Sequence, residues 1–137
     1  MVTERYIVKG DDFQAAGSAS SAMKQMLRGA GVPMEVIRRA AICMYEGEIN
    51  MVIHARGGEA EVSFDGQEIT MTLSDNGSGI ENPQLALKEG WSTATDEIRG
   101  LGFGAGMGLP NMKRNSDDLT IESVPGKGTT IVMKIKV

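Results

Sequence analysis

One acidic residue, Asp75, lies where its side chain could bind a polar group of a ligand. Asp75 follows a strand-like run over 67–73 and opens the sequence Asp-Asn-Gly-Ser-Gly that ends at Gly79. Gly77 and Gly79 let the backbone turn sharply and approach a flat group closely. A carboxylate fixed at the end of a strand by such a turn can accept a hydrogen bond from a ligand's amino group. The same sequence is also typical of an ordinary turn, and both interpretations are open at this point.

A second acid and an amide are spaced for one face of a helix. Glu46, Asn50 and His54 stand four residues apart, so their side chains would project from the same side of an α-helix. A carboxylate and an amide one turn apart can share a hydrated Mg²⁺, and the acid can also accept a proton from water or a hydroxyl. The alternative is a helix-surface pair without a ligand. Glu48 is the rival acid, but it lies about 200° round the helix from Glu46 and should face away from Asn50. For His54 we expect no catalytic role.

Glycine occupies every second position from Gly100 to Gly108, directly before a helix expected over 109–115. Such a loop exposes backbone N–H groups and leads to a helix N-terminus at Leu109, a natural site for phosphate. It is not a Walker loop, because no Gly-Lys-Ser/Thr follows. It is not a Rossmann fingerprint either, because no strand precedes it. A flexible linker is the alternative, and for Lys113 and Arg114 in the following helix we expect a solvated face.

A threonine near the C-terminus is the last candidate. Thr129 follows the turn Gly126-Lys-Gly128 and precedes the final strand. Its hydroxyl could approach the Asp75 carboxylate through a water molecule. A turn threonine without a ligand is the alternative.

The elements that must position these residues follow the order β-α-α-β-β-α-loop-α-β-β. We expect a helix over about 12–28, capped by Asp11 or Asp12. The remaining helices are expected over 33–55, 83–89 and 109–115, and the strands over 2–9, 59–64, 68–73, 119–124 and 130–137. Hairpin-linked strands with helices grouped apart predict an α+β fold: a two-layer α/β sandwich with a mixed, mainly antiparallel sheet and helices on one face. The helix over 33–55 is apolar nearly all round, so it should be buried. A long loop over 90–108 is of a kind that is usually functional.

Length and composition limit the number of domains, the class of ligand and the location of the protein. The 137 residues suffice for one domain, which we expect to span 1–137. A net charge of −4 argues against non-specific binding of nucleic acid. The single cysteine, Cys43, cannot form an internal disulfide, so we expect a reducing, cytoplasmic location. The sequence has no signal peptide and no apolar run of about 18 residues, so we expect no membrane contact.

Taken in order, these motifs resemble the Bergerat-type ATP-binding fold shared by gyrase, histidine kinases and mismatch-repair ATPases. The pair formed by Glu46 and Asn50 matches the N box of that fold, and Asp75-x-Gly77-x-Gly79 matches the G1 box. The glycine lid Gly104-x-Gly106-x-Gly108 matches the G2 box, and Gly128-Thr129 follows. The resemblance covers nearly the whole chain.

Within that superfamily the chain is similar to the small bacterial serine kinases that act as anti-sigma factors or partner-switching kinases. The sequences Gly90-Trp-Ser-Thr93 and Gly108-Leu-Pro-Asn-Met-Lys-Arg114 are closest to the stress-response switch kinases. Two features depart from the pattern. The lid is doubled, with Gly-Ala-Gly followed by Gly-Met-Gly, and residues 94–99 look like an insertion.

The resemblance implies a role for each matched residue. Asp75 accepts the adenine amino proton with help from Thr129 through water, while Gly77 and Gly79 let the base approach. Asn50 ligates Mg²⁺, and Glu46 is the base that acts on a serine hydroxyl of a partner protein or on water. The β- and γ-phosphates are held by the lid and the following helix N-terminus, comprising Gly104, Gly106, Met107, Gly108 and Leu109.

The resemblance also implies a function. It predicts an ATP- and Mg²⁺-dependent protein serine kinase that controls transcription by switching partners, which would be a sigma factor or an antagonist carrying the target serine. The alternative is a catalytically weak, nucleotide-gated protein-binding module of the same fold. We expect no direct contact with nucleic acid. The methionine-rich first two helices offer a surface through which a homodimer could form.

Overall fold

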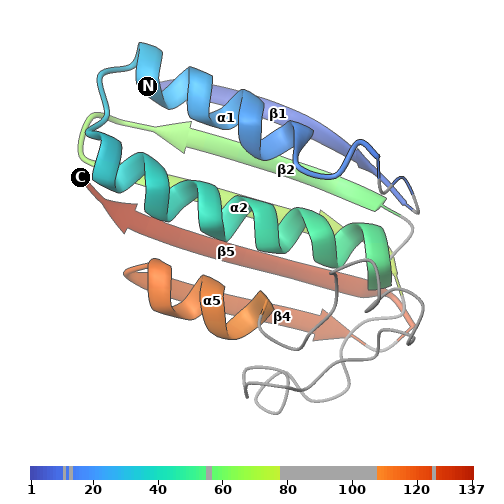
Figure 1. Ribbon diagram of the computed structural model, residues 1–137. Helices are drawn as coiled ribbons and strands as arrows, with labels where there is room; N and C mark the ends of the chain where they lie inside the picture. The colour runs from blue at the N-terminus through green and yellow to red at the C-terminus, as the bar shows by residue number, and fades with distance from the viewer. Residues whose placement is uncertain (11, 13, 55–56, 78–107, 125) are drawn as a thin grey trace.

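A single antiparallel sheet with helices on one face forms the described part of the chain (Figure 1). The computed structural model describes residues 1–137 except 11, 13, 55–56, 78–107 and 125. The strands follow the order β1-β2-β3-β5-β4 in the sheet. They are β1 (Val2–Lys9), β2 (Gly57–Phe64), β3 (Glu68–Asp75), β4 (Asp118–Val124) and β5 (Gly128–Lys136), and the helices are α1 (Ser18–Gly29), α2 (Met34–His54) and α5 (Gly108–Asn115). The predicted α+β sandwich is confirmed. The sheet was expected to be mixed, but every described pairing is antiparallel.

Apolar residues alternate with more exposed residues along the strands, which makes one face of the sheet apolar. Every second residue of the three central strands points toward the helices, because successive side chains of a strand lie on opposite faces. The residues on that face of β2, β3 and β5 are buried, whereas their neighbours in sequence are partly exposed. These core residues are Ala60, Val62, Phe64, Ile69, Met71, Leu73, Ile131, Met133 and Ile135.

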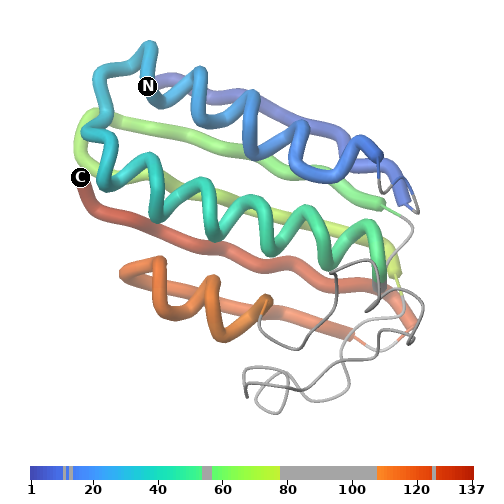
Figure 2. The backbone as a smooth tube through the Cα atoms, viewed as in Figure 1, coloured from blue at the N-terminus to red at the C-terminus, as the bar shows by residue number. Residues whose placement is uncertain are grey.

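Helix α2 lies between α1 and α5 and over the middle of the sheet (Figure 2). Ile37, Ala40 and Met44 on this helix are buried, which confirms the expected central position. Gly47 faces the sheet, since a Cβ at that position would overlap the Leu73 side chain. The missing side chain therefore lets the middle of α2 approach β3 closely. None of the described helices, α2 included, combines the length and apolar character needed to cross a membrane.

Boundaries of four elements differ from the prediction by two residues or more. Strands β2 and β5 begin at residues 57 and 128, two residues before their predicted starts. Helix α1 begins at Ser18, and Asp12 instead accepts a hydrogen bond from the Ala15 N–H (3.2 Å) in the turn before it. Strand β3 was expected to end at residue 73, but it runs through Asp75 because partners on both sides, Gly58 and Thr129, continue the ladder. The helix expected over 83–89 and most of the loop expected over 90–108 lie outside the described residues.

The elements that carry the candidate residues meet at one end of the sheet. Helix α2 and strand β3 end there, and α5 and β5 begin there (Figure 1). The strand register forms a row across the sheet at this end, from Gly58 through Asp75 and Thr129 to Ser123. Residues far apart in the sequence are therefore neighbours here.

Candidate functional site

The row at the end of the sheet places a hydroxyl beside a carboxylate. Thr129 is directly opposite Asp75 in the antiparallel pair of β3 and β5, and Cβ atoms of such pairs lie about 4.5–5.5 Å apart. Thr129 is buried, and its Oγ1 atom lies 2.9 Å from Ser123 Oγ. The Asp75 Oδ1 atom accepts the Gly77 N–H across 2.9 Å. The turn after β3 thus fixes one oxygen of the carboxylate, with the buried hydroxyl of Thr129 next to it.

Two glycines allow the backbone to close around Asp75. Gly128 has φ 130°, and a Cβ there would collide with the Asp75 carbonyl oxygen. A Cβ on Gly58 would lie 2.6 Å from Met51 Sδ and 3.1 Å from Asp75 Cβ. Because Met51 belongs to α2, the last turns of that helix pack against the start of β2, which pairs with the end of β3. The residue before it, Asn50, is therefore carried toward the same end of the sheet.

Glu46 and Asn50 converge on the first residue of α5. A Cβ built on Gly108 would lie 3.2 Å from Asn50 Oδ1 and 3.3 Å from Glu46 Oε2. The first turn of a helix carries backbone N–H groups without partners in the helix, so it attracts anions such as phosphate. The acid, the amide and this helix start thus border one space, which any side chain at 108 would fill. Leu109, the next residue, is buried.

Burial shapes the electrostatics of Glu46. Its carboxylate is half-buried, and this desolvation raises the pKa of Glu46 above its ordinary value. A hydrogen bond from the Asn111 amide (Nδ2 to Oε1, 3.4 Å) favours the charged form and opposes the increase. Oε2 makes no hydrogen bond within the described residues, and a carboxylate with a raised pKa and such a free oxygen is suited to accept a proton. Sequence reasoning missed Asn111, although its spacing of three from Gly108 places both on one face of α5.

Glu48 has a different role. It is buried, and its two oxygens accept hydrogen bonds from the backbone N–H groups of Gly17 (2.9 Å), Ala19 (3.2 Å) and Ser20 (3.2 Å). Glu48 therefore caps the N-terminus of α1, where Gly17 provides no side-chain cap. Its oxygens are engaged by these amides, which leaves Glu46 as the acid on α2 that faces the site. Sequence reasoning excluded Glu48 from the site but did not find its partners.

The oxygen of the Asn50 amide suits a magnesium ion. Magnesium prefers oxygen ligands, and in nucleotide sites it takes one or two protein ligands while phosphates and waters complete the octahedron. Within the described ranges, no group of three or more His, Cys, Asp and Glu residues could hold a metal ion.

Several predicted site residues cannot be placed. Gly79, Gly104, Gly106 and Met107 lie outside the described residues. The structure brings Glu46, Asn50, Gly108 and Leu109 together, and it brings Asp75, Gly77 and Thr129 together in the neighbouring row. Lys113 is exposed, as expected for a solvated face.

Sequence comparison identifies related proteins. Residues 35–137 match the family described as histidine kinase-, DNA gyrase B-, and HSP90-like ATPase. An anti-sigma F factor of Thermoanaerobacter sp. (strain X514) is 32% identical over 99 residues, covering 72% of this chain but only 62% of that protein. An anti-sigma F factor of Clostridium acetobutylicum is 32% identical over 108 residues, covering 75% of this chain and 72% of the relative. One of Clostridium perfringens (strain SM101) is 36% identical over 102 residues, covering 74% and 66%.

Solved structures share the fold. The structure of the RsbU and RsbW domains of Rv1364c from Mycobacterium tuberculosis superimposes with a TM-score of 0.66 at 14% identity, covering 98% of this chain and 32% of that one. The mycobacterial sensor histidine kinase MprB superimposes with a TM-score of 0.56 at 15% identity, covering 98% and 97%. At these identities the likeness concerns the fold alone.

Proposed function

Because this chain belongs to the histidine kinase-, DNA gyrase B- and HSP90-like ATPase family, we propose that it is an ATP-dependent serine kinase that regulates transcription by phosphorylating a partner protein. The family predicted from the ordered motifs is confirmed. The observation that carries the proposal is the convergence of Glu46 and Asn50 on Gly108 at the start of α5. It supplies a base, an oxygen ligand and a helix N-terminus around one space.

In this proposal the row at the end of β3 binds the adenine base. The Asp75 carboxylate accepts the adenine amino proton, and the Thr129 hydroxyl contacts the base through water. Gly77 after the turn leaves room for the flat ring. A carboxylate that accepts from an amino group repels the oxygen that guanine presents at the same position, so we expect ATP to bind at least about 100-fold more tightly than GTP.

The phosphates lie, in this proposal, between Asn50 and the first turn of α5. Asn50 provides the protein oxygen for Mg²⁺, which neutralises phosphate charge when it is bound. The backbone N–H groups at Gly108 and Leu109 bind phosphate oxygens. Phosphoryl transfer depends mainly on such positioning and charge stabilisation, and needs no nucleophile from the chain.

Glu46 acts as the base in the transfer step. Its free oxygen takes the proton of the attacking hydroxyl as the hydroxyl oxygen bonds to the γ-phosphorus. The bond from the γ-phosphorus to the bridging oxygen breaks, and ADP leaves with that electron pair. Glu46 then returns its proton to solvent. The buried thiol of Cys43, whose pKa is raised to about 12 by burial, takes no part.

The relatives indicate the kind of partner. Proteins named anti-sigma F factors are 31–36% identical to this chain. We propose that the partner is a sigma factor or an antagonist protein carrying the target serine, that residues 1–137 form one domain, and that the protein works in the cytoplasm where such partners act.

The test combines capture with a transfer assay. The protein is incubated with a cell extract in the presence of Mg²⁺ and either ATP or ADP, and captured proteins are analysed by mass spectrometry for phosphoserine. Glu46→Ala should lower transfer by about 10²–10⁴-fold while ATP still binds. Glu35→Ala is the matched control, because Glu35 is an exposed acid on the same helix, paired with Arg38. Full activity in Glu46→Ala contradicts the base assignment, and nucleotide-dependent binding without transfer favours the nucleotide-gated binding module.

A further inference from the structure

A hydrogen bond between helices orients the proposed base. The Asn111 amide of α5 donates to Glu46 Oε1 across 3.4 Å, and both side chains are partly buried. The other oxygen, Oε2, lies 3.3 Å from where a Cβ on Gly108 would stand. The two oxygens therefore face different parts of α5: one meets the Asn111 amide, and the other faces the first residue of the helix.

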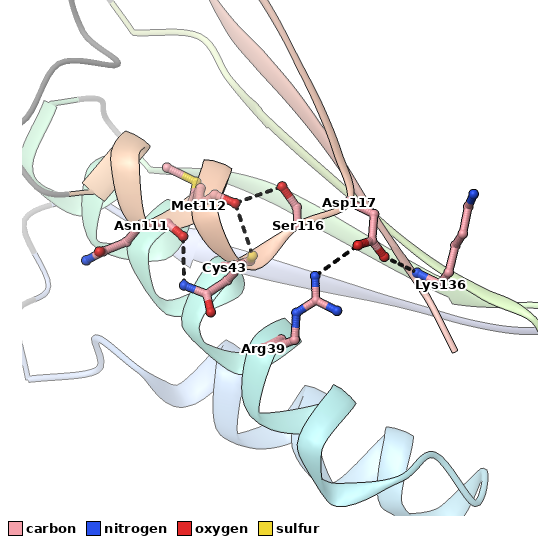
Figure 3. Close-up of polar contacts among 8 residues, drawn as sticks. Arg39, Cys43, Asn111, Met112, Ser116, Asp117 and Lys136 are labelled. Carbon is pink, nitrogen blue, oxygen red and sulfur yellow. Dashed lines mark hydrogen bonds and ion pairs between the residues drawn. The ribbon is translucent and has the colours of Figure 1, made fainter.

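Contacts within α5 and with α2 hold Asn111 in place. The Asn111 carbonyl accepts a hydrogen bond from the Asn115 side-chain amide (2.9 Å). Its neighbour Met112 is fully buried, and the Met112 carbonyl accepts from Ser116 Oγ (2.7 Å) and lies 3.6 Å from Cys43 Sγ of α2 (Figure 3). The backbone that carries the Asn111 side chain is therefore fixed against α2.

The residues after α5 anchor it a second time. Asp117 pairs with Arg39 of α2 (3.1 Å) and accepts the backbone N–H of Lys136 in β5 (2.7 Å), as Figure 3 shows. These contacts tie the end of α5 to both α2 and the sheet. A side chain on such a doubly anchored helix can hold a neighbouring carboxylate with little loss of its own conformational freedom.

An amide is suited to this task because it donates without carrying charge. A lysine or arginine at the same place would form an ion pair with Glu46 and strongly favour its ionised form, which weakens it as a base. The Asn111 amide restrains the rotation of the carboxylate and leaves its charge in place. Without that restraint, both oxygens of Glu46 could turn away from the first turn of α5.

We propose that Asn111 is a positioning residue for the base: its amide holds Oε1 of Glu46 so that Oε2 faces the start of α5, where the attacking hydroxyl loses its proton. This inference rests on the proposed function, since it assigns a role in the same transfer step. It adds a residue that neither the motifs nor the family match assigns.

The test uses the full chain, with water as the acceptor so that no partner is needed. Release of labelled phosphate from γ-labelled ATP is measured for the wild-type protein, Asn111→Leu, Glu46→Gln and the double variant. Leucine keeps the shape of asparagine and removes the donor. Lys113→Leu is the matched control: it introduces the same new side chain on the exposed face of α5. Binding of Mg²⁺·ATP is measured by calorimetry for every variant.

We expect Asn111→Leu to lower kcat about 10- to 100-fold and to leave the Kd for ATP within about twofold, because misplacing a reacting group costs rate and not binding. In the Glu46→Gln background the same change should have no further effect on kcat. Lys113→Leu should leave kcat within about twofold of the wild type. An equal loss of kcat from Asn111→Leu with and without Glu46, or a loss matched by Lys113→Leu, overturns the inference.

An activity-independent readout separates the two proposals. The side-chain amide signals of Asn111 in a ¹H–¹⁵N NMR spectrum should shift in Glu46→Ala, whereas those of Asn115 should stay unchanged. If the wild-type protein binds ATP but neither releases phosphate nor transfers it to a captured partner, the proposed function fails, and the amide signals still show whether Asn111 holds Glu46. If phosphate is released and the Asn111 signals do not respond to Glu46→Ala, the inference alone fails.

Discussion

The buried cap at Glu48 leads to a quantitative prediction about stability. Glu48 is 2% exposed, and its carboxylate accepts three backbone N–H groups at the start of α1, of which those of Ala19 and Ser20 are in buried residues. The change Glu48→Gln keeps the shape of the side chain, removes its charge and replaces one oxygen by an NH₂ group. That group would face at least one backbone donor.

The expected loss follows from these contacts. A buried N–H left facing another donor costs about 1–3 kcal/mol. Weakening a hydrogen bond by removing the charge of its acceptor costs about 0.5–1 kcal/mol for each of the remaining amides. We therefore expect Glu48→Gln to lower the free energy of unfolding by about 2–5 kcal/mol. Since domains are commonly stable by about 5–15 kcal/mol, the variant should still fold.

Urea unfolding followed by circular dichroism measures this loss, and hydrogen exchange localises it. The amides of Ala19 and Ser20 should exchange faster in the variant, together with the rest of the first turn of α1. Glu35→Gln is the control on the same helix: Glu35 is exposed and contacts only Arg38 among the described residues, so its replacement should change stability little. If Glu48→Gln is as stable as the control, Glu48 does not stabilise α1 by capping.

Two further predictions concern the site itself. Glu46→Gln, measured in magnesium-free buffer, should become increasingly more stable than the wild type as the pH rises above about 4, the ordinary range of a glutamate carboxyl. The reason is that burial raises the pKa of Glu46, so the wild type loses stability as that carboxyl ionises. Urea unfolding at a series of pH values measures both proteins. A stability difference that does not change with pH would contradict the prediction. Gly128→Ala should destabilise the protein by at least about 2 kcal/mol more than Gly66→Ala. Both glycines have positive φ, but a Cβ at 66 would meet open space, while a Cβ at 128 would collide with the Asp75 carbonyl. If thermal unfolding shows equal losses of stability in the two variants, the close approach of Gly128 to Asp75 is unimportant.

Local spacing predicted the parts of the site that lie on one element. Glu46 and Asn50 could be placed on one face of α2 because helix geometry depends only on their separation of four residues. The hairpin of β4 and β5 does not by itself bring β5 beside β3, and the proximity of Thr129 to Asp75 was predicted from the family resemblance. The all-round apolar character of α2 likewise predicted its central position.

Contacts between distant segments could not be predicted in the same way. The cap of α1 is supplied by Glu48, 31 residues after Gly17, so no local pattern at residues 11–18 indicates where the helix begins. Strand β3 continues to Asp75 because Gly58 and Thr129 pair with it from both sides, which overrides the low strand propensity of aspartate. The bond from Asn111 to Glu46 depends on how α5 packs against α2, and that packing is visible only in three dimensions.

Three consecutive residues of α2 explain why the base faces α5. Successive residues of a helix are turned by about 100°, and Glu46, Gly47 and Glu48 accordingly contact α5, the sheet and α1. Rotating the helix by one residue in either direction would turn a carboxylate toward the apolar surface around Leu73, at a cost of several kcal/mol for a charge without partners. The rotation of α2 is therefore determined by where Glu46 and Glu48 can remain solvated or paired. The same constraint that holds the helix in register directs Glu46 toward the start of α5.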